Sequence, residues 1–332
     1  MSDTIGKSFK VTTHGESHGD AVGCVIEGVP AGTEISLDGI QEELSRRRPG
    51  HSELSSARKE PDKLEVVSGI ENGKATGAIK LQVRNVDARP EDYSEIMNKP
   101  RPGHADMAQF QKFGKIPAGG GRASGRETVG RVLAGAVAKQ VLEKEGIEIA
   151  TRIIEVHGMN EGIEDEILKT KADGDSVGGI VEITATGIPP GLGEPVFGKL
   201  DAELAKALMS IPAVKGVEIG AGFESAKMLG SENNDAIVVE DGELKTRTNN
   251  AGGILGGISN GMPIVCRIAV KPTSSIAKEQ DTIDLRTMKP AKLSVKGRHD
   301  PCIVPRILPV AEAMVAIVIL DHLLSRKNKG EQ

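Results

Sequence analysis

Histidine, glycine and acidic residues gather in an octapeptide close to the N-terminus, and side chains of this kind can bind a metal or transfer a proton. Residues 13–20 read THGESHGD, which places His14 and His18 four positions apart. Two His at this spacing on one helix form a zinc site in some enzymes, whereas one His on a glycine-rich turn suits catalysis. Gly15 and Gly19 disfavour a helix, and no Cys-rich or HExxH-like segment supplies further ligands. The sequence therefore predicts no metal site.

Three further segments carry groups that bind anions. GGGRASGRE at 119–127 is a glycine-rich loop expected to lead into a helix, whose N-terminal N–H groups and dipole favour a phosphate. Arg122 and Arg126 would add charge-assisted hydrogen bonds. SRRRPGH at 45–51 ends another predicted helix with three arginines, and KPTSS at 271–275 offers one charge and three hydroxyls. Taken singly, each segment also fits an ordinary solvated loop or helix end.

Two more histidines lie in predicted turns. RPGHAD at 101–106 and KGRHDP at 296–301 each set a His beside Asp and Gly or Pro, and such turns hold polar side chains in fixed directions. A single His of this kind usually has a structural role. Three such His segments, together with three segments rich in arginine or hydroxyls, point to a phosphate-rich ligand site that contains acid–base groups.

The composition excludes several classes of protein. The 332 residues, 38% hydrophobic and 27% charged, are typical of a soluble globular protein. A net charge of −5, with no Trp and one Tyr, argues against binding to nucleic acid or to a membrane surface. Three widely spaced Cys predict neither a disulfide framework nor a zinc knuckle, and fit a reducing cytoplasm. The apolar run near 307–320 is broken by Glu312 and is better interpreted as a buried helix than as a membrane span.

Apolar periodicity indicates which elements would position these groups. The predicted helices span 37–48, 124–145, 200–210 and about 309–326. In the second of these, Ser124 and Glu127 have the spacing of a capping box, and Gly146 would stop the helix.

Runs rich in β-branched residues predict strands between the helices. They lie at 78–85, 178–188 and 263–273, with a hairpin at 236–247 that turns at Asp241–Gly242. Helices alternate irregularly with hairpin-like strand pairs, which favours an α+β layered fold over repeated βαβ units. No linker is evident, so the whole chain, 1–332, is predicted to form a single domain.

Taken together, these segments resemble those of chorismate synthases over nearly the whole chain. The number, order and spacing of the motifs make the resemblance specific, and His18 lies inside the recurring GESHG motif whereas His14 lies outside it. The motifs are GESHG at 15–19, RRRPG at 46–50, RPGHAD at 101–106, GGGRAS at 119–124, RET at 126–128, GDSVGG at 174–179, GLGEPVF at 191–197, AVKGVEIG at 213–220, NNAGGILGGISNG at 249–261, KPTSS at 271–275 and GRHDP at 297–301.

The resemblance implies a particular reaction and fold. Chorismate synthases convert 5-enolpyruvylshikimate 3-phosphate to chorismate and phosphate by a 1,4-anti elimination, the final common step of the shikimate pathway to aromatic amino acids. They are phosphate lyases that require reduced FMN, although the reaction has no net redox change. The implied fold is a single-domain β-α-β sandwich, with helices packed between antiparallel sheets, in a cytoplasmic homotetramer.

The resemblance also implies roles for individual residues. His18 would protonate the departing phosphate, His104 would stabilise or protonate the reduced flavin ring, and Asp300 would assist removal of the C6 proton. Arg47 and Arg48 would bind the substrate, with Arg126 nearby. The residues implied to hold FMN are Arg122, Ala123, Ser124, Pro212, Ala213, Gly256, Lys271, Pro272, Thr273, Ser274, Ser275 and Arg298.

The chain departs from the family pattern at two positions. The flavin loop often reads Arg-Ser-Ser, whereas here Ala123 replaces the first Ser. Many members carry an arginine shortly after RRRPG, where this chain has His51, Ser52 and Glu53. That arginine is sometimes assigned to the binding of NADPH. Because this chain lacks it, Arg47 is the possible NADP contact, and a separate flavin-reducing system is expected.

Two rival functions stay open on the sequence. A flavin oxidoreductase with net hydride transfer would consume reductant in step with product, whereas the elimination needs reductant only catalytically. A non-catalytic phosphate- or flavin-binding module would leave His18, His104 and Asp300 without a chemical role.

Overall fold

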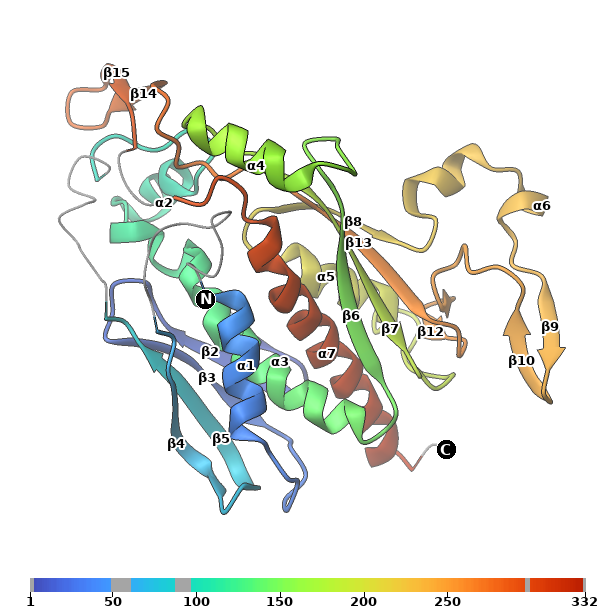
Figure 1. Cartoon of the computed structure of the whole chain (residues 1–332). Coiled ribbons are helices and arrows are strands. Elements are labelled where there is room, and N and C mark those ends of the chain that lie inside the picture. Colours follow the sequence, from blue (N-terminus) through green and yellow to red (C-terminus); the bar gives the residue numbers. More distant parts are fainter. Residues whose placement is uncertain (1–2, 49–60, 87–96, 296–298, 331–332) are drawn as a thin grey trace.

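The computed structural model describes residues 3–48, 61–86, 97–295 and 299–330. Two antiparallel sheets form its outer layers (Figure 1). The five-stranded sheet has the order β1 (Thr4–Ile5), β2 (Lys10–Gly15), β3 (Ala21–Glu27), β5 (Lys74–Arg84) and β4 (Leu64–Glu71). The four-stranded sheet has the order β6 (Glu148–Val156), β7 (Gly179–Thr186), β13 (Ile264–Val270) and β8 (Val214–Ile219).

Four helices fill the space between the two sheets (Figure 1). They are α1 (Leu37–Arg47), α3 (Thr128–Glu143), α5 (Leu200–Met209) and α7 (Val304–Asn328). Helix α3 packs on β3 and on α7, while α7 also packs on β6 and β7. The predicted β-α-β sandwich is therefore confirmed.

The two central helices approach each other closely because small residues face one another. A Cβ added at Gly135 of α3 would lie 2.2 Å from Cβ of Ala313 on α7, so only glycine fits there. Helix α7 is buried on nearly all sides, as its almost uniformly apolar sequence predicts. Among the described residues it is the one helix long and apolar enough to cross a membrane, but its most apolar window is 83% buried in the protein.

The predicted elements are largely confirmed, with shifted ends. Helix α7 begins at Val304 rather than at 309, because Pro305 lies in the first turn, where a proline needs no N–H donor. Helix α3 begins at Thr128 rather than at 124, because a 3-10 turn at Gly125–Glu127 precedes it. Strand β5 begins at Lys74 rather than at 78.

The predicted hairpin turn is also confirmed. Strands β9 (Ile237–Glu240) and β10 (Glu243–Thr246) pair antiparallel, and Asp241 and Gly242 both have positive φ. This hairpin and α6 (Gly230–Asn233) form an arm, residues 222–246, that projects from the body of the molecule (Figure 1).

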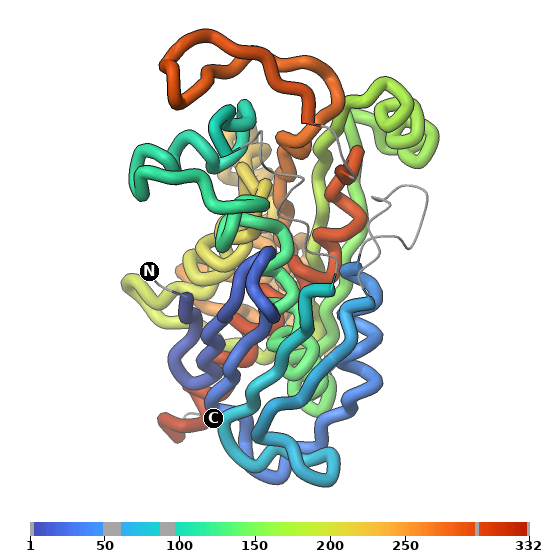
Figure 2. The backbone as a smooth tube through the Cα atoms, turned by 90° about the vertical axis from the view of Figure 1, so that its left-hand side faces the viewer, coloured from blue at the N-terminus to red at the C-terminus, as the bar shows by residue number. Residues whose placement is uncertain are grey.

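The remaining elements lie around the sandwich. Figure 2 shows α2 (Asp106–Phe113) and the hairpin of β14 (Gln280–Asp284) and β15 (Lys289–Leu293) at the same end of the molecule. A hydrogen bond from Leu285 N to Asn98 O, at 2.8 Å, joins these segments. The other elements are α4 (Ile163–Ala172), β11 (Ile254–Leu255) and β12 (Ile258–Ser259).

One continuous cluster of buried apolar side chains extends through both sheets and the four central helices. The three cysteines are buried and unpaired. Organisation as a single domain over 1–332 stays a prediction.

Candidate active site

A cavity of about 690 Å³ lies where α1 and α5 end and where α3 and α7 begin. This volume is in the range of small-molecule sites. Two helix N-termini and two helix C-termini meet there, so their partial charges largely offset one another, but basic side chains outnumber acidic ones in the lining. The cavity is therefore suited to an anionic ligand.

A run of three glycines at the cavity brings two histidines together. Gly119, Gly120 and Gly121 have φ of 61°, 87° and 54°, in the left-handed region. A Cβ at Gly119 would lie 2.3 Å from Cε1 of His18, and a Cβ at Gly120 would lie 3.0 Å from Cε1 of His104. Both the backbone conformation and the two imidazole rings thus require glycine.

His18 lies on the turn between β2 and β3, whereas His14 lies within β2. This arrangement confirms that THGESHGD is not a helix. The Oγ of Ser17 is 3.1 Å from Nδ1 of His18 and 3.5 Å from the carbonyl oxygen of Gly119. Ser17 is buried, so it holds the ring against the glycine loop.

The ring of His104 is oriented by a buried carboxylate. Its Nδ1 is 2.5 Å from Oδ1 of Asp106, and Asp106 also accepts from Arg101 Nε at 2.7 Å and Nη2 at 2.9 Å. Burial by itself would raise the pKa of Asp106, but the hydrogen bonds from Arg101 and His104 hold it far below its ordinary value. Nδ1 of His104 must therefore donate, and in the neutral ring Nε2 is the acceptor.

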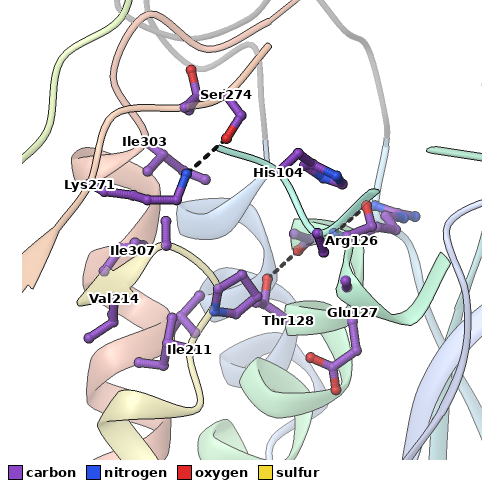
Figure 3. Close-up of a pocket in the computed structure, with 18 of the residues that line it drawn as sticks. His104, Arg126, Glu127, Thr128, Ile211, Val214, Lys271, Ser274, Ile303 and Ile307 are labelled. Atoms are coloured by element: carbon purple, nitrogen blue, oxygen red, sulfur yellow. Dashed lines mark hydrogen bonds between the residues drawn. The ribbon is translucent and has the colours of Figure 1, made fainter. Parts of the chain in front are cut away.

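Two arginines on the same side of the cavity as His104 are almost fully buried (Figure 3). Arg47 Nη2 donates to Oδ2 of Asp62 at 2.7 Å, and Arg126 Nη1 donates to Oδ1 of the same residue. Arg126 Nε also donates to Oδ1 of Asn85 at 2.8 Å. A single carboxylate thus bridges two of the predicted substrate-binding arginines.

Asp300 is paired with an arginine at the start of α7. Arg306 Nη1 donates to Oδ2 of Asp300, and Arg306 Nε donates to the carbonyl oxygen of Arg47 at 3.2 Å. The carbonyl oxygen of Asp300 accepts from Thr273 Oγ1 at 2.9 Å. These contacts tie the Asp300 segment to the end of α1.

An apolar wall and a polar cluster face the histidine and arginine side of the cavity. Figure 3 shows Ile307 of α7 and Ile303, which precedes that helix, with Val214 and Ile211 on one side, and His104 and Arg126 opposite them. Lys271 Nζ donates to Ser274 Oγ at 2.9 Å. Burial, helped by the charge of Lys215, lowers the pKa of Lys271.

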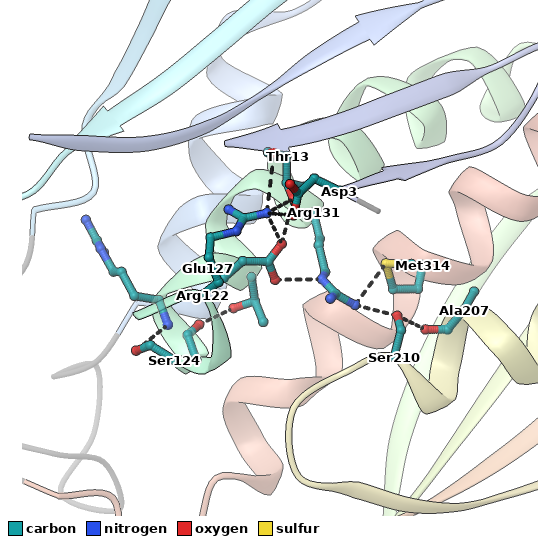
Figure 4. A network of polar contacts seen from close by, with 12 residues as sticks. Asp3, Thr13, Arg122, Ser124, Glu127, Arg131, Ala207, Ser210 and Met314 are labelled. Atoms are coloured by element: carbon teal, nitrogen blue, oxygen red, sulfur yellow. Dashed lines mark hydrogen bonds and ion pairs between the residues drawn. The ribbon is translucent and has the colours of Figure 1, made fainter. Parts of the chain in front are cut away.

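Arg122 lines the cavity, but its guanidinium is bound to the N-terminal sheet (Figure 4). It donates to Gly15 O at 2.7 Å, Thr13 Oγ1 at 2.8 Å and Asp3 Oδ1 at 2.8 Å.

The predicted capping box does not form, because the side chain of Glu127 is used elsewhere. Ser124 Oγ accepts from Arg126 N at the start of the 3-10 turn. The carboxylate of Glu127 instead accepts from Thr13 Oγ1 at 2.8 Å and Arg131 Nε at 2.9 Å, as Figure 4 shows.

Most of the predicted site residues meet at this cavity. Those that line it are Arg47, His104, Arg122, Ala123, Ser124, Arg126, Pro212, Ala213, Lys271, Thr273, Ser274, Ser275 and Asp300. His18 adjoins the lining residue Gly119, and Arg48 and Pro272 are chain neighbours of lining residues. Arg298 lies outside the described residues.

Gly256 is the exception, because it lies at the far end of α5. It is in the turn between β11 and β12, where Gly257 O accepts from Leu200 N, the first residue of α5, at 2.8 Å. The cavity begins at Met209, the last residue of that helix. Ten helical residues correspond to about 15 Å, so Gly256 does not reach the cavity of its own chain.

Four residues that organise the site had no predicted role, namely Asp62, Arg101, Asp106 and Arg306. Arg101 and Asp106 lie at the two ends of the RPGHAD motif, so their closeness to His104 in the sequence could have indicated that they contact it. Arg306 follows GRHDP closely. Asp62 has no comparable signal, because its partners are remote in the sequence. Among the described residues, no group of three or more His, Cys, Asp and Glu side chains could hold a metal ion.

Comparison with known proteins identifies the family. The sequence model of the chorismate synthase family matches residues 9–324. The chorismate synthase of Methanosarcina mazei is 52% identical over 97% of this chain and 96% of that protein, and that of Prochlorococcus marinus is 47% identical over 99% of each. A crystal structure of a chorismate synthase superposes with a TM-score of 0.75 at 30% identity, covering 97% of this chain and 93% of the other. The chain therefore belongs to the chorismate synthase family.

Proposed function

We propose that this protein catalyses the 1,4-anti elimination of phosphate from 5-enolpyruvylshikimate 3-phosphate to give chorismate, with reduced FMN required and no net redox change. The observation that carries the proposal is the cavity lined by His104, Asp300 and a buried arginine pair, with His18 against the lining residue Gly119, in a chain of the chorismate synthase family. An arginine-rich site in an otherwise acidic chain suits a substrate with two carboxylates and a phosphate.

The lining of the cavity fits a flavin mononucleotide. Ile303, Ile307 and Val214 offer an apolar wall for a planar ring, while Lys271 and the hydroxyl of Ser274 form a polar cluster for a phosphate or ribityl chain. When bound, reduced FMN would supply electron density to the substrate as phosphate departs. The residues proposed to hold it are Arg122, Ala123, Ser124, Pro212, Ala213, Gly256, Lys271, Pro272, Thr273, Ser274, Ser275 and Arg298.

The binding and proton-transfer steps are assigned to this chain's own side chains. Arg47, Arg48 and Arg126 would bind the phosphate and carboxylates of the substrate. As the C–O bond to phosphate breaks, His18 would donate a proton to the departing phosphate. A nearby dianion favours the charged form of an imidazole, which suits this role.

The proton on C6 leaves in the same overall reaction. Asp300 would assist its removal, and the electron pair of the C–H bond would become part of the new double bond. Arg306 holds the carboxylate of Asp300 in place. His104, fixed by Asp106, would present Nε2 to the reduced flavin ring. It would stabilise the ring as a hydrogen-bond acceptor when neutral, or protonate it when both ring nitrogens carry a proton.

The reductant is proposed to come from outside the chain. Ala123 replaces a hydroxyl residue of the usual flavin loop, and Glu53 stands near where many members carry an arginine assigned to NADPH. We therefore propose a separate flavin-reducing system, with Arg47 as the possible NADP contact.

A homotetramer in the cytoplasm is proposed as the working form. Exposed apolar side chains on the arm, among them Phe223, Ile237 and Leu244, support burial against other copies. The distance of Gly256 from its own cavity supports the same view, since a flavin contact from this residue would have to reach a neighbouring copy. Burial of α7 inside the sandwich agrees with a protein that does not insert into membranes.

The test is product formation by the purified protein under anaerobic conditions. Substrate with reduced FMN should give chorismate and phosphate in equal amounts, and substrate with oxidised FMN should give neither. Equal rates with reduced and oxidised FMN, or no product with either, would refute the proposal.

A further inference from the structure

We propose that Asp62 is the positioning residue of the substrate-binding arginines. Its carboxylate holds Arg47 and Arg126 side by side at the cavity wall and supplies the countercharge that they need before an anionic ligand arrives. This inference rests on the proposed function, because it takes the arginine pair as the place where the anionic groups of the substrate bind.

The contacts of Asp62 place it behind the two arginines. It is fully buried, and its two carboxylate oxygens accept separately, one from Arg47 Nη2 at 2.7 Å and the other from Arg126 Nη1. Both arginines line the cavity, whereas Asp62 does not. Asp62 therefore acts on a ligand only through the orientation and charge of the arginines.

Asp62, Arg47 and Arg126 form a triad with an excess of positive charge, which favours an anion. Two buried guanidinium groups share one carboxylate, which leaves a net charge of about +1. Burial raises the pKa of Asp62, but the charges of Arg47 and Arg126 more than offset this effect and hold the pKa below its ordinary value. Asp62 is thus ionised at neutral pH, and an incoming anion would supply the second negative charge.

Arg47 also carries a buried donor that no described group satisfies. Its side chain is 2% exposed, and its Nε has no hydrogen-bond partner among the described residues. A buried donor without a partner is destabilising. Because Asp62 fixes the guanidinium plane through Nη2, it determines the direction in which Nε is offered.

The backbone of Asp62 is built to hold this position. Its φ of 44° lies in the left-handed region, which Asp and Asn tolerate better than other residues with a side chain. Gln41 of α1 donates from Nε2 to the carbonyl oxygen of Asp62 at 3.0 Å and accepts from Leu64 N at 2.9 Å. Helix α1 thus holds both Arg47 and the segment that carries its counter-ion.

Asp62→Asn is the sharpest test, because Asn keeps the shape and tolerates the backbone but removes the charge. Inorganic phosphate is the probe, with thermal unfolding followed over a phosphate titration. The variant should unfold at a lower temperature without phosphate, and the difference from wild type should narrow as phosphate rises. Phosphate should bind about 5- to 150-fold more tightly to the variant, the usual range for coupling between sites. Turnover should fall on the order of 10²-fold without a rise in KM, since the arginines lose their alignment.

Glu65→Gln is the matched control, because Glu65 lies close to Asp62 in the sequence but its partly exposed carboxylate accepts from Arg84 and Gln82 instead of from Arg47 and Arg126. Its phosphate affinity and turnover should equal those of wild type. A loss of stability in Asp62→Asn that phosphate does not reduce would mean a purely structural role and would overturn the proposal. Unchanged turnover in Asp62→Asn would overturn it as well.

Asp62→Glu decides the question if the Asn variant does not fold. This variant keeps the charge but lengthens the side chain, so it should retain wild-type phosphate affinity within a few-fold and still lose turnover on the order of 10²-fold. Normal turnover in Asp62→Glu would overturn the positioning role. Failure of the wild-type protein to form chorismate would refute the proposed function, whereas the phosphate comparison needs no catalysis and tests Asp62 separately.

Discussion

His18 and His104 owe their proximity to a loop that belongs to neither of their segments. Gly119 packs against the ring of His18 and Gly120 against the ring of His104, so closely that a Cβ at either position would be crowded. The glycine-rich loop predicted from the sequence as a phosphate-binding feature thus has a second use, which is to pack against the imidazoles. At the residue scale, the site depends on glycines, which have no side chain, as much as on the side chains that bind or react.

Gly119→Ala tests this dependence. The new methyl group would overlap the ring of His18 and push it from its place, so turnover should fall on the order of 10²-fold. Steady-state kinetics with reduced FMN gives the measurement. Gly32→Ala is the control, because Gly32 has a similar positive φ but no atom within 4 Å. It should cost only about 1 kcal/mol of stability and leave turnover intact; a Gly119→Ala enzyme as active as the Gly32→Ala enzyme would contradict the packing role.

The proposed proton-transfer groups give a second prediction at this scale. His18→Ala and Asp300→Ala should fold and bind FMN but lose about 10²- to 10⁴-fold in turnover, the usual contribution of one positioned acid or base. Flavin titration and chorismate formation measure the two properties separately. His14→Ala, the other half of the octapeptide, should retain nearly wild-type turnover. A His18 variant no worse than the His14 variant would remove the assigned role.

Helix α7 connects the cavity to a buried ionic cluster farther along its length. Glu312 accepts from Arg46 Nη2 at 2.7 Å, Lys139 Nζ at 2.9 Å and Thr151 Oγ1 at 2.6 Å. These contacts join α7 to α1, α3 and β6, and Arg46 immediately precedes the cavity residue Arg47. The cluster therefore fixes the end of α1 relative to the start of α7.

The stability of this cluster should depend on pH in a defined window. Burial by itself would raise the pKa of Glu312, but the hydrogen bonds from Arg46 and the charge of Lys139 lower it to about 2 from an ordinary 4.5. Because the folded pKa is depressed, the contribution of Glu312 is complete above about pH 4.5 and is lost as the pH falls toward 2.

Glu312→Gln measures that contribution by denaturant unfolding at several pH values. The variant should be less stable by about 3 kcal/mol at neutral pH, and the difference should shrink progressively below about pH 4.5. The exposed Glu164→Gln on α4 should change stability by less than about 0.5 kcal/mol. A difference for Glu312→Gln that stays constant down to about pH 2 would contradict the account.

The elements show why some of the fold could be predicted and some could not. The four central helices were predictable because their apolar residues recur at helical spacing, as in α3, whereas α2, α4 and α6 were not predicted. The Asp241–Gly242 turn was predictable from its dipeptide. Asn72–Gly73 is a turn dipeptide of the same kind, and both residues have positive φ between β4 and β5. No hairpin was predicted there from the sequence. Strands β2 and β3 were not predicted, because the THGESHGD segment, which contains the end of β2, was interpreted only as a turn.

The site was predictable only as far as its motifs extend. The residues that carry the resemblance, such as His104 and Asp300, meet at the cavity as expected. Their orienting partners are set by tertiary contacts: Arg306 contacts Asp300 from α7, and Asp62 contacts Arg47 of α1. No periodicity or spacing encodes such pairs, so only the folded structure could identify them.

At the scale of the whole molecule, the arm is the part whose exposed apolar side chains are hardest to account for in a monomer. On the hairpin, Val239 and Leu244 are opposite each other in register and both largely exposed, and Ile237 lies on the same face. A two-stranded hairpin with an uncovered apolar face is marginally stable alone. The arm is therefore expected to be covered by another copy of the chain.

Replacing Val239 and Leu244 together by Asp should convert the proposed tetramer to a smaller species, because two charges would be buried in the interface. Size-exclusion chromatography with light scattering gives the mass. Lys245→Asp, which introduces the same acid on the other face of the hairpin, should leave the mass unchanged. A double variant that stays tetrameric would show that the arm is not the assembly surface.

The central claim is an elimination that needs a reduced flavin without consuming it. The most direct test mixes protein, a small amount of reduced FMN and excess 5-enolpyruvylshikimate 3-phosphate without oxygen, and follows chorismate, phosphate and flavin absorbance together. We predict equal amounts of the two products, many turnovers per flavin, and a flavin that is still reduced at the end. One oxidised flavin for each product molecule would contradict the elimination and make the protein an oxidoreductase.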